Sequence, residues 1–248
     1  TILNKEAAMK PLLAPLLAAL GLFSTAAAAQ ELNLYSARHY QTDEALYANF
    51  TKATGIRINR IEAGDEQLLE RLRSEGANSP ADVLLIVDAS RLYNAQQLGL
   101  FQPVKSALLE SRIPATLRDP GGEWFGFSSR ARVIVYSKAR VKAADVPSYE
   151  SLSAAANKGR VCVRSGSHPY NLSLVAAMIE HLGEPKAEAW ARGVVANFAR
   201  APKGGDTDQI KAVAAGECDV ALSNSYYYAR LLRSARVEDQ EVVAKAGI

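Results

Sequence analysis

The sequence predicts an α/β protein with two open sheets, and three observations point to this class. Short apolar or alternating runs typical of strands recur along the chain, with amphipathic helical segments between them. Most of these helical segments end at a glycine, which commonly terminates a helix. The alternation breaks once, at two consecutive extended segments over residues 124–136. Such a break suits a crossover between domains, so we expect two α/β lobes with helices covering the faces of each sheet.

The first half of the chain predicts three strand–helix units. The expected strands lie at 31–36, 56–61 and 80–87, and the expected helices at 43–54, 64–75 and 90–98. The first two strands alternate apolar and polar residues, whereas the third is a continuous apolar run typical of a buried parallel strand. Residues 106–122 contain Pro114 and a Pro120-Gly-Gly turn and are expected to form a loop.

The second half predicts another α/β unit. Helices are expected at 148–157, 171–182, 185–198 and 207–215, and strands at 160–164 and 219–222. Ser223 and Asn224 follow the last strand and offer N-caps for a helix that begins near Ser225.

Residues 1–29 have the pattern of upstream residues followed by a secretory signal peptide. Met9-Lys10 precedes an apolar run from Leu12 to Phe23, and Ala27-x-Ala29 forms a cleavage site. The mature chain is therefore expected to start at Gln30 or Glu31, outside the cytoplasm. The net charge is +3, and basic and acidic residues are interspersed, which makes nucleic acid a poor candidate partner.

The two cysteines, Cys162 and Cys218, adjoin predicted strands. In an oxidising compartment they can form one disulfide, and two free buried thiols are the alternative. They are too few and too far apart in the sequence to indicate a metal cluster.

Aromatic and imidazole side chains gather in three strand-to-helix loops. These loops carry His39 with Tyr40, His168 with Tyr170, and Tyr226 with Tyr227. Ligands of open α/β sheets bind at the edge where such loops lie. Phenolate oxygen is a hard anionic donor suited to a small, highly charged cation such as Fe³⁺. The alternative is an aromatic cluster that merely covers the sheet edge.

Five segments together resemble the periplasmic ferric-iron-binding proteins of bacterial ABC importers, in their tyrosine-rich branch. They are Tyr35–Asp43, Pro80–Val83, Gly126–Tyr136, Val163–Asn171 and Asn224–Tyr228. The resemblance implies a two-domain, type II periplasmic-binding-protein fold with open mixed sheets and hinge strands. It also implies a monomer that delivers ferric ion to an inner-membrane permease.

Matching the family's motifs gives the expected ligands, which are Tyr40 with His39, Tyr170, and the pair Tyr226 and Tyr227. The resemblance makes Tyr228 a packing aromatic of the same helix. It also suggests that Arg130, rather than Arg132, holds an anion such as carbonate.

Two features depart from the family pattern. Where the transferrin-like branch has a Glu ligand, this chain has Val87 beside Asp88, so no carboxylate ligand is assigned. Family members also continue through elements that complete the first sheet, so we expect a chain truncated at its C-terminus. The expected lobes are residues 30–128, incomplete without that return, and 129–248, with a hinge crossover near 125–136.

Two other functions compete with ferric-ion capture. A receptor of the same fold for a small organic solute or oxyanion would use Arg130, or Ser165 and Ser167, as donors to an anion. A secreted hydrolase is suggested by Ser165-Gly-Ser167 beside His168, but the sequence has no Gly-x-Ser-x-Gly elbow. We therefore expect a binding protein and not an enzyme.

Overall fold

The computed structural model describes residues 30–38 and 40–248, so the expected signal peptide and His39 lie outside the described residues. The chain divides into two compact units. Of the described residues, 30–32 and 40–59 belong to the first unit, and 33–38 and 60–248 to the second. The predicted lobe boundaries at 128 and 129 stay a prediction.

The first unit contains helix α1 (Gln41–Thr54) and the starts of two strands. Tyr40 occupies the N-cap position of α1 with an extended backbone. The helix ends at Gly55, whose φ of 72° lies in the left-handed region that glycine adopts without strain. Arg57 pairs with Glu31 across the two strands of this unit.

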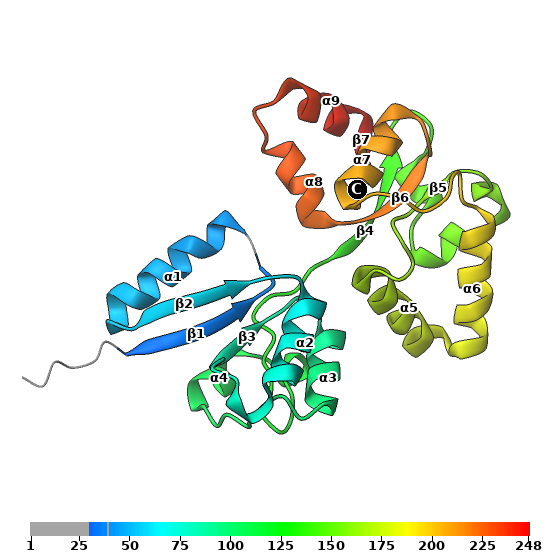
Figure 1. The fold of residues 1–248 in the computed structure, drawn as a ribbon. Coiled ribbons are helices and arrows are strands. Elements are labelled where there is room, and N and C mark those ends of the chain that lie inside the picture. Colours follow the sequence, from blue (N-terminus) through cyan, green and yellow to red (C-terminus); the bar gives the residue numbers. More distant parts are fainter. Residues whose placement is uncertain (1–29, 39) are drawn as a thin grey trace, which may run out of the picture. The chain divides into compact units, whose positions relative to one another are not determined.

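The first sheet has the strand order β2-β1-β3 (Figure 1). Its strands are β1 (Glu31–Ser36), β2 (Arg57–Glu62) and β3 (Val83–Leu85), and the helices that follow are α2 (Asp65–Glu75), α3 (Ala89–Gln97) and α4 (Ala107–Arg112). β1 and β3 are parallel, with Tyr35 opposite Leu84. The predicted strand–helix order is therefore confirmed.

The second sheet has the strand order β5-β6-β4-β7. These strands are β4 (Arg132–Ser137), β5 (Val161–Cys162), β6 (Val220–Asn224) and β7 (Ala246–Gly247). β5 runs parallel to β6, whereas β4 is antiparallel to both β6 and β7, so this sheet is mixed. The register places Arg132 opposite Asn224.

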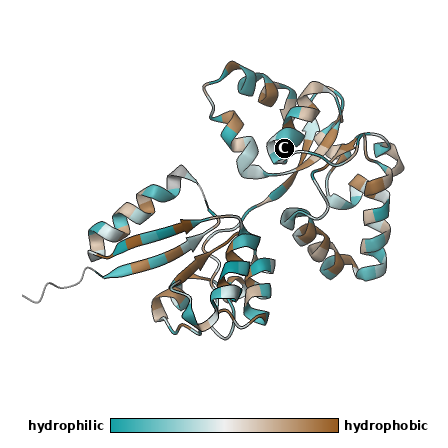
Figure 2. Cartoon of the chain, viewed as in Figure 1, coloured by the Kyte–Doolittle hydropathy of each residue, from teal (hydrophilic) through white to brown (hydrophobic). Residues whose placement is uncertain are grey.

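Helices of the second half form two groups of core contacts. They are α5 (Pro169–Leu182), α6 (Glu184–Ala196), α7 (Asp206–Ala215), α8 (Ser225–Leu232) and α9 (Val237–Lys245). Val220 and Leu222 join the cluster that contains residues of α5 and α6, whereas Ala221 joins the cluster that contains residues of α7, α8 and α9. Alternate residues of β6 thus enter different clusters, as expected for a strand buried on both faces. Figure 2 shows the largely apolar character of α5.

Three sequence predictions are wrong at the level of single elements. Residues 107–112 form α4 rather than a loop, and Ser106 Oγ caps this helix by accepting a hydrogen bond from Leu109 N. The helix has only six residues, too few for a helical repeat of apolar residues to be visible in the sequence. Residues 148–157 form two 3₁₀ turns rather than an α-helix. In that segment Ser151 and Ser153 donate their hydroxyls to carbonyls three residues back, a local bond that competes with regular helix.

The third correction concerns residues 124–131, which do not form a strand apart from an isolated bridge at Phe125. The strand predicted across this stretch starts only at Arg132.

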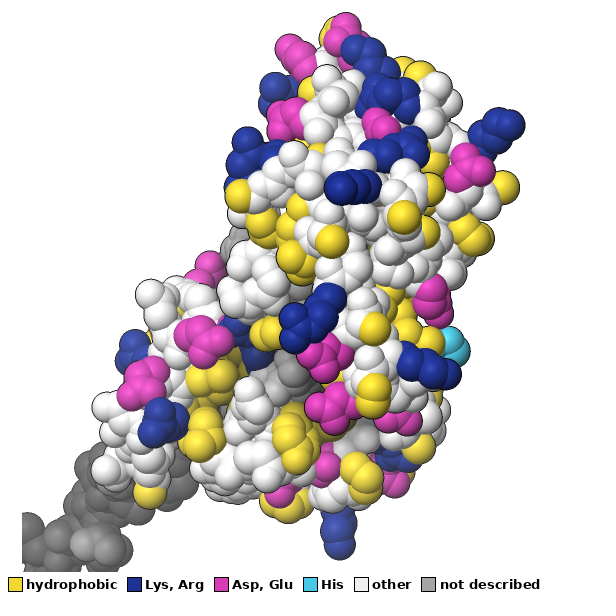
Figure 3. All heavy atoms as spheres, turned by 90° about the vertical axis from the view of Figure 1, so that its right-hand side faces the viewer, with side chains coloured by type: hydrophobic (Ala, Val, Ile, Leu, Met, Phe, Trp, Pro, Cys, Tyr) yellow, Lys and Arg dark blue, Asp and Glu magenta, His cyan; other side chains and the backbone are white. Residues whose placement is uncertain are grey.

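Within the described part of the chain, no helix combines the length and apolar character needed to cross a membrane. Both signs of charge occur over the face seen in Figure 3.

Candidate metal centre

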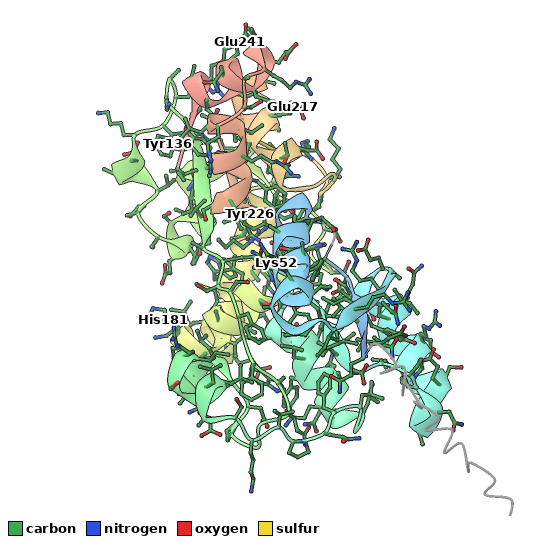
Figure 4. All side chains as sticks on the ribbon, turned by 90° about the vertical axis from the view of Figure 1, so that its left-hand side faces the viewer. Lys52, Tyr136, His181, Glu217, Tyr226 and Glu241 are labelled. Carbon is green, nitrogen blue, oxygen red and sulfur yellow. A yellow bond between two sulfur atoms is a disulfide. The ribbon has the colours of Figure 1, made fainter. Side chains whose placement is uncertain are left out.

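Tyr226 and Tyr227 lie in the first turn of α8, directly after β6. All five residues of β6 are buried, and Asn224 has the extended backbone of an N-cap. Side chains of neighbouring residues in a regular helix diverge by about 100°. The rings of Tyr226 and Tyr227 nevertheless lie with their centroids 4.3 Å apart and their planes 32° apart. Figure 4 labels Tyr226 at the start of this helix.

Tyr170 brings a second phenol oxygen to Tyr226. It lies in the first turn of α5, where the His168 Nδ1 atom accepts a hydrogen bond of 3.2 Å from Tyr170 N and caps the helix. Tyr170 is 9% exposed, and its Oη is 3.1 Å from the Oη of Tyr226. Two phenol oxygens that are 56 residues apart in the sequence therefore meet at one point.

Guanidinium groups surround these phenols. The Cζ atoms of Arg130, Arg132 and Arg164 lie 5.2, 5.9 and 5.3 Å from the centroid of the Tyr170 ring. The Cζ of Arg230 lies 5.3 Å from the centroid of the Tyr227 ring. These positions are within the range of cation–π contact and make the surroundings of the phenols electropositive.

His168 is neutral at pH 7 in this environment. Burial lowers the pKa of His168 to about 4, and the nearby positive charge of Arg164 acts in the same direction. A neutral imidazole can accept at Nδ1, which matches its hydrogen bond from Tyr170 N. His168 therefore caps α5 as a neutral imidazole.

The remaining predicted site residues have separate outcomes. Tyr40 belongs to the first compact unit and is described apart from the other phenols, so its role as a ligand stays a prediction. His39 lies outside the described residues. Tyr228 is buried and donates its hydroxyl to Ala246 O at 3.0 Å, as expected for a packing aromatic.

Cys162 and Cys218 form a disulfide with Cα atoms 5.9 Å apart. Cys162 is the last residue of β5, and Cys218 lies two residues before β6. Both are buried in the cluster that contains residues of α7, α8 and α9. The disulfide therefore joins the end of β5 to the segment that leads into β6, its parallel neighbour in the sheet.

Sequence reasoning missed the buried carboxylate of this region. Asp206, 1% exposed, forms ion pairs of 3.1 Å with Arg132 and 3.0 Å with Arg164. An Asp in the first turn of a helix is so common that its pattern gave no signal. Asn224 occupies the predicted N-cap position of α8, and its Oδ1 accepts a hydrogen bond from Arg132 instead of from the helix backbone.

Comparison with known proteins gives a consistent result. Residues 78–242 match the model of the family described as bacterial extracellular solute-binding protein. The chain is 53% identical over 219 residues to iron uptake protein A1 of Synechocystis sp., covering 88% of this chain and 61% of that protein. It is 32% identical over 203 residues to the Fe(3+)-binding periplasmic protein of Serratia marcescens, covering 82% of this chain and 59% of that protein.

A solved Trichodesmium structure, IdiA or FutA in complex with iron and citrate ligands, superposes with a TM-score of 0.83. The identity is 55%, and the match covers 88% of this chain and 69% of that chain. The predicted two-domain type II fold is confirmed by this neighbour and by the two open sheets of this α/β chain. The chain spans about three fifths of the length of its curated relatives. The chain belongs to the family of bacterial extracellular solute-binding proteins.

Proposed function

We propose that the chain is part of a periplasmic binding protein that captures ferric ion through tyrosine phenolates and delivers it to an inner-membrane ABC permease. It acts as a carrier and performs no catalytic turnover. The observation that carries the proposal is the 3.1 Å approach of the Tyr170 and Tyr226 hydroxyls, with the Tyr227 ring packed beside Tyr226. The names of the iron-uptake and ferric-binding relatives support the same cargo.

Charge balance explains why these side chains fit a trivalent cation. A bound cation displaces the protons of its phenol ligands, so three phenolates from Tyr170, Tyr226 and Tyr227 neutralise Fe³⁺. A fourth, from Tyr40, would leave one negative charge. Arg130 can offset that charge or hold an anion such as carbonate that completes the coordination. Tyr40 and His39 are proposed to add their ligands when lobes 30–128 and 129–248 close about the crossover near 125–136.

The experiment is a titration of the iron-free protein with ferric citrate, read by visible absorbance. Ferric phenolate absorbs in the visible range, so the wild type should become coloured. The Tyr170→Phe variant and the double variant Tyr226→Phe with Tyr227→Phe should lose most of the colour. Tyr228→Phe is the matched control, because its hydroxyl hydrogen-bonds to Ala246 O within the core. It should keep the colour while losing about 1 kcal/mol of stability. Full colour in the double variant would remove these phenols from the site.

The runner-up function is a receptor for a small organic solute or oxyanion. It is favoured by the four guanidinium groups near Tyr170 and Tyr227, which would attract an anionic solute without any metal. Calorimetry with citrate alone and with ferric citrate separates the two functions. Heat of binding from citrate alone, without visible colour from the ferric complex, would favour the solute receptor.

A further inference from the structure

We propose that Asp206 is a positioning residue that holds the segments carrying Tyr170 and Tyr226 at a fixed separation. This inference rests on the proposed function of those phenols as iron ligands. Asp206 is the first residue of α7, and its side chain is completely buried. Its carboxylate accepts hydrogen bonds from Arg132, Arg164 and Asn224, and we infer that it acts on the phenols through these residues.

One carboxylate oxygen of Asp206 is bonded to the strand that leads to Tyr226. Asn224 N donates to Asp206 Oδ2 at 2.7 Å, and Arg132 Nη1 donates to the same oxygen at 3.1 Å. Arg132 Nη1 also donates to Asn224 Oδ1 at 3.1 Å. Both the backbone and the side chain of Asn224 are thereby fixed, two residues before Tyr226.

The same hydrogen-bonded cluster, which consists of Asp206, Arg132, Arg164, Asn171 and Asn224, also fixes the segment that carries Tyr170. Arg132 Nη2 donates to Asn171 Oδ1 at 2.7 Å, and Asn171 follows Tyr170 directly. The side-chain Nδ2 of Asn171 donates to the carbonyls of Arg164 and Ser165, each at 3.0 Å. Arg164 Nη1 in turn donates to Asp206 Oδ1 at 3.0 Å. Oδ2 of Asp206 is therefore linked to the segments of both Tyr226 and Tyr170, and Oδ1 is linked to the Tyr170 segment through Arg164.

Stability alone does not account for this arrangement. Buried ion pairs cost so much desolvation that well-packed apolar residues can often replace them without loss of stability. Asp206 has two guanidiniums, a backbone N–H and its place in the first turn of α7 to offset the cost of burial. What the cluster provides is a set of directional bonds that ends beside both phenols. Directional bonds of this kind to the neighbours of metal ligands orient the ligands.

The other end of β6 offers a matched control. Asp219, the residue before β6, also bridges two guanidiniums, those of Arg140 and Arg160. Its side chain is 19% exposed, whereas that of Asp206 is 0% exposed. Asp219 lies at the end of the strand opposite Asn224, so its substitution should affect stability and not the phenols.

The test compares Asp206→Asn with Asp219→Asn by ferric citrate titration, the position of the visible absorption band and thermal unfolding. Asp206→Asn should weaken iron binding by roughly tenfold or more and shift the band, because it frees the phenol-bearing segments and removes the negative charge shared by Arg132 and Arg164. Asp219→Asn should lower the unfolding temperature and keep the affinity and band of the wild type. Asn224→Ala keeps both ion pairs of Asp206, so it provides a second test of the proposal if Asp206→Asn does not fold. It should weaken iron binding several-fold, by loss of one hydrogen bond.

The outcomes separate this inference from the proposed function. If the wild type shows no ferric phenolate band, the proposed function fails. If the wild type shows the band and the folded variants at Asp206 and Asn224 keep its position and affinity, only the role of Asp206 is overturned. Equal loss of affinity in Asp219→Asn and Asp206→Asn would also overturn it, because the effect would then be general destabilisation.

Discussion

Removal of the Cys162–Cys218 disulfide should destabilise the second half of the chain strongly. The disulfide closes a sequence separation of 56, a loop that contains α5, α6 and α7. In the chain-entropy account, a loop of this size restricts the unfolded chain by an amount equal to about 4 kcal/mol at 25 °C. A typical domain has a net stability of roughly 5–15 kcal/mol. The disulfide would thus account for a large part of the total.

The measurement is urea unfolding of the oxidised wild type, the reduced wild type and the double variant Cys162→Ala with Cys218→Ala. The two forms without the bond should unfold at similar, lower urea concentrations, and a reducing agent should not affect the double variant. A thiol assay that finds two free cysteines in the reduced wild type is the control. Reduced protein with two free thiols and the urea midpoint of the oxidised form would refute the reasoning.

Two further predictions concern stability. Asp219 should make the protein sensitive to acid: burial raises the pKa of its carboxyl, but hydrogen bonds from Arg140 and Arg160 outweigh this and lower the pKa overall. A carboxyl whose pKa is lower in the folded state stabilises the protein at pH values above its unfolded-state pKa of about 4. This stabilisation is lost as the pH falls through the folded-state pKa. The gap in unfolding free energy between wild type and Asp219→Asn should therefore narrow below about pH 4, and a constant gap would contradict this. Gly193→Ala in α6 should lower the unfolding temperature, although alanine favours helix by about 1 kcal/mol, because its Cβ would lie 2.8 Å from Ser153 Cβ. An unchanged or higher unfolding temperature would contradict this prediction and show that the Ser153 segment shifts to accommodate the methyl group without loss of stability.

The regular elements were predictable because their side-chain periods reflect burial. β6 shows this well, since its apolar residues are buried on both faces and its end marks the start of α8. The segment 148–157 was not predictable in the same way. Its composition favours helix, but serine hydroxyls bond locally to the backbone and Leu152 is fully buried, so packing and local bonds override propensity.

The phenols of the site were predictable, whereas the network behind them was not. Tyr170 and Tyr226 stand out because tyrosine in strand-to-helix loops is an unusual choice for a core. Asp206 looks like any acidic residue at a helix start, and Arg132 looks like any polar residue at a strand start. Their pairing depends on contacts across 74 residues of sequence, which no local pattern records.

The charges around the phenols bear on the form in which iron would arrive. The phenols are accompanied by the guanidiniums of Arg130, Arg132, Arg164 and Arg230, and two of these, Arg132 and Arg164, share the carboxylate of Asp206. This surplus of positive charge repels a free trivalent cation and attracts an anion. If the proposed function holds, the arginines therefore favour ferric ion carried by an anionic chelator such as citrate. Once the phenols lose their protons to the metal, the same guanidiniums offset the negative charge of the phenolates, so one set of residues would serve both capture and retention.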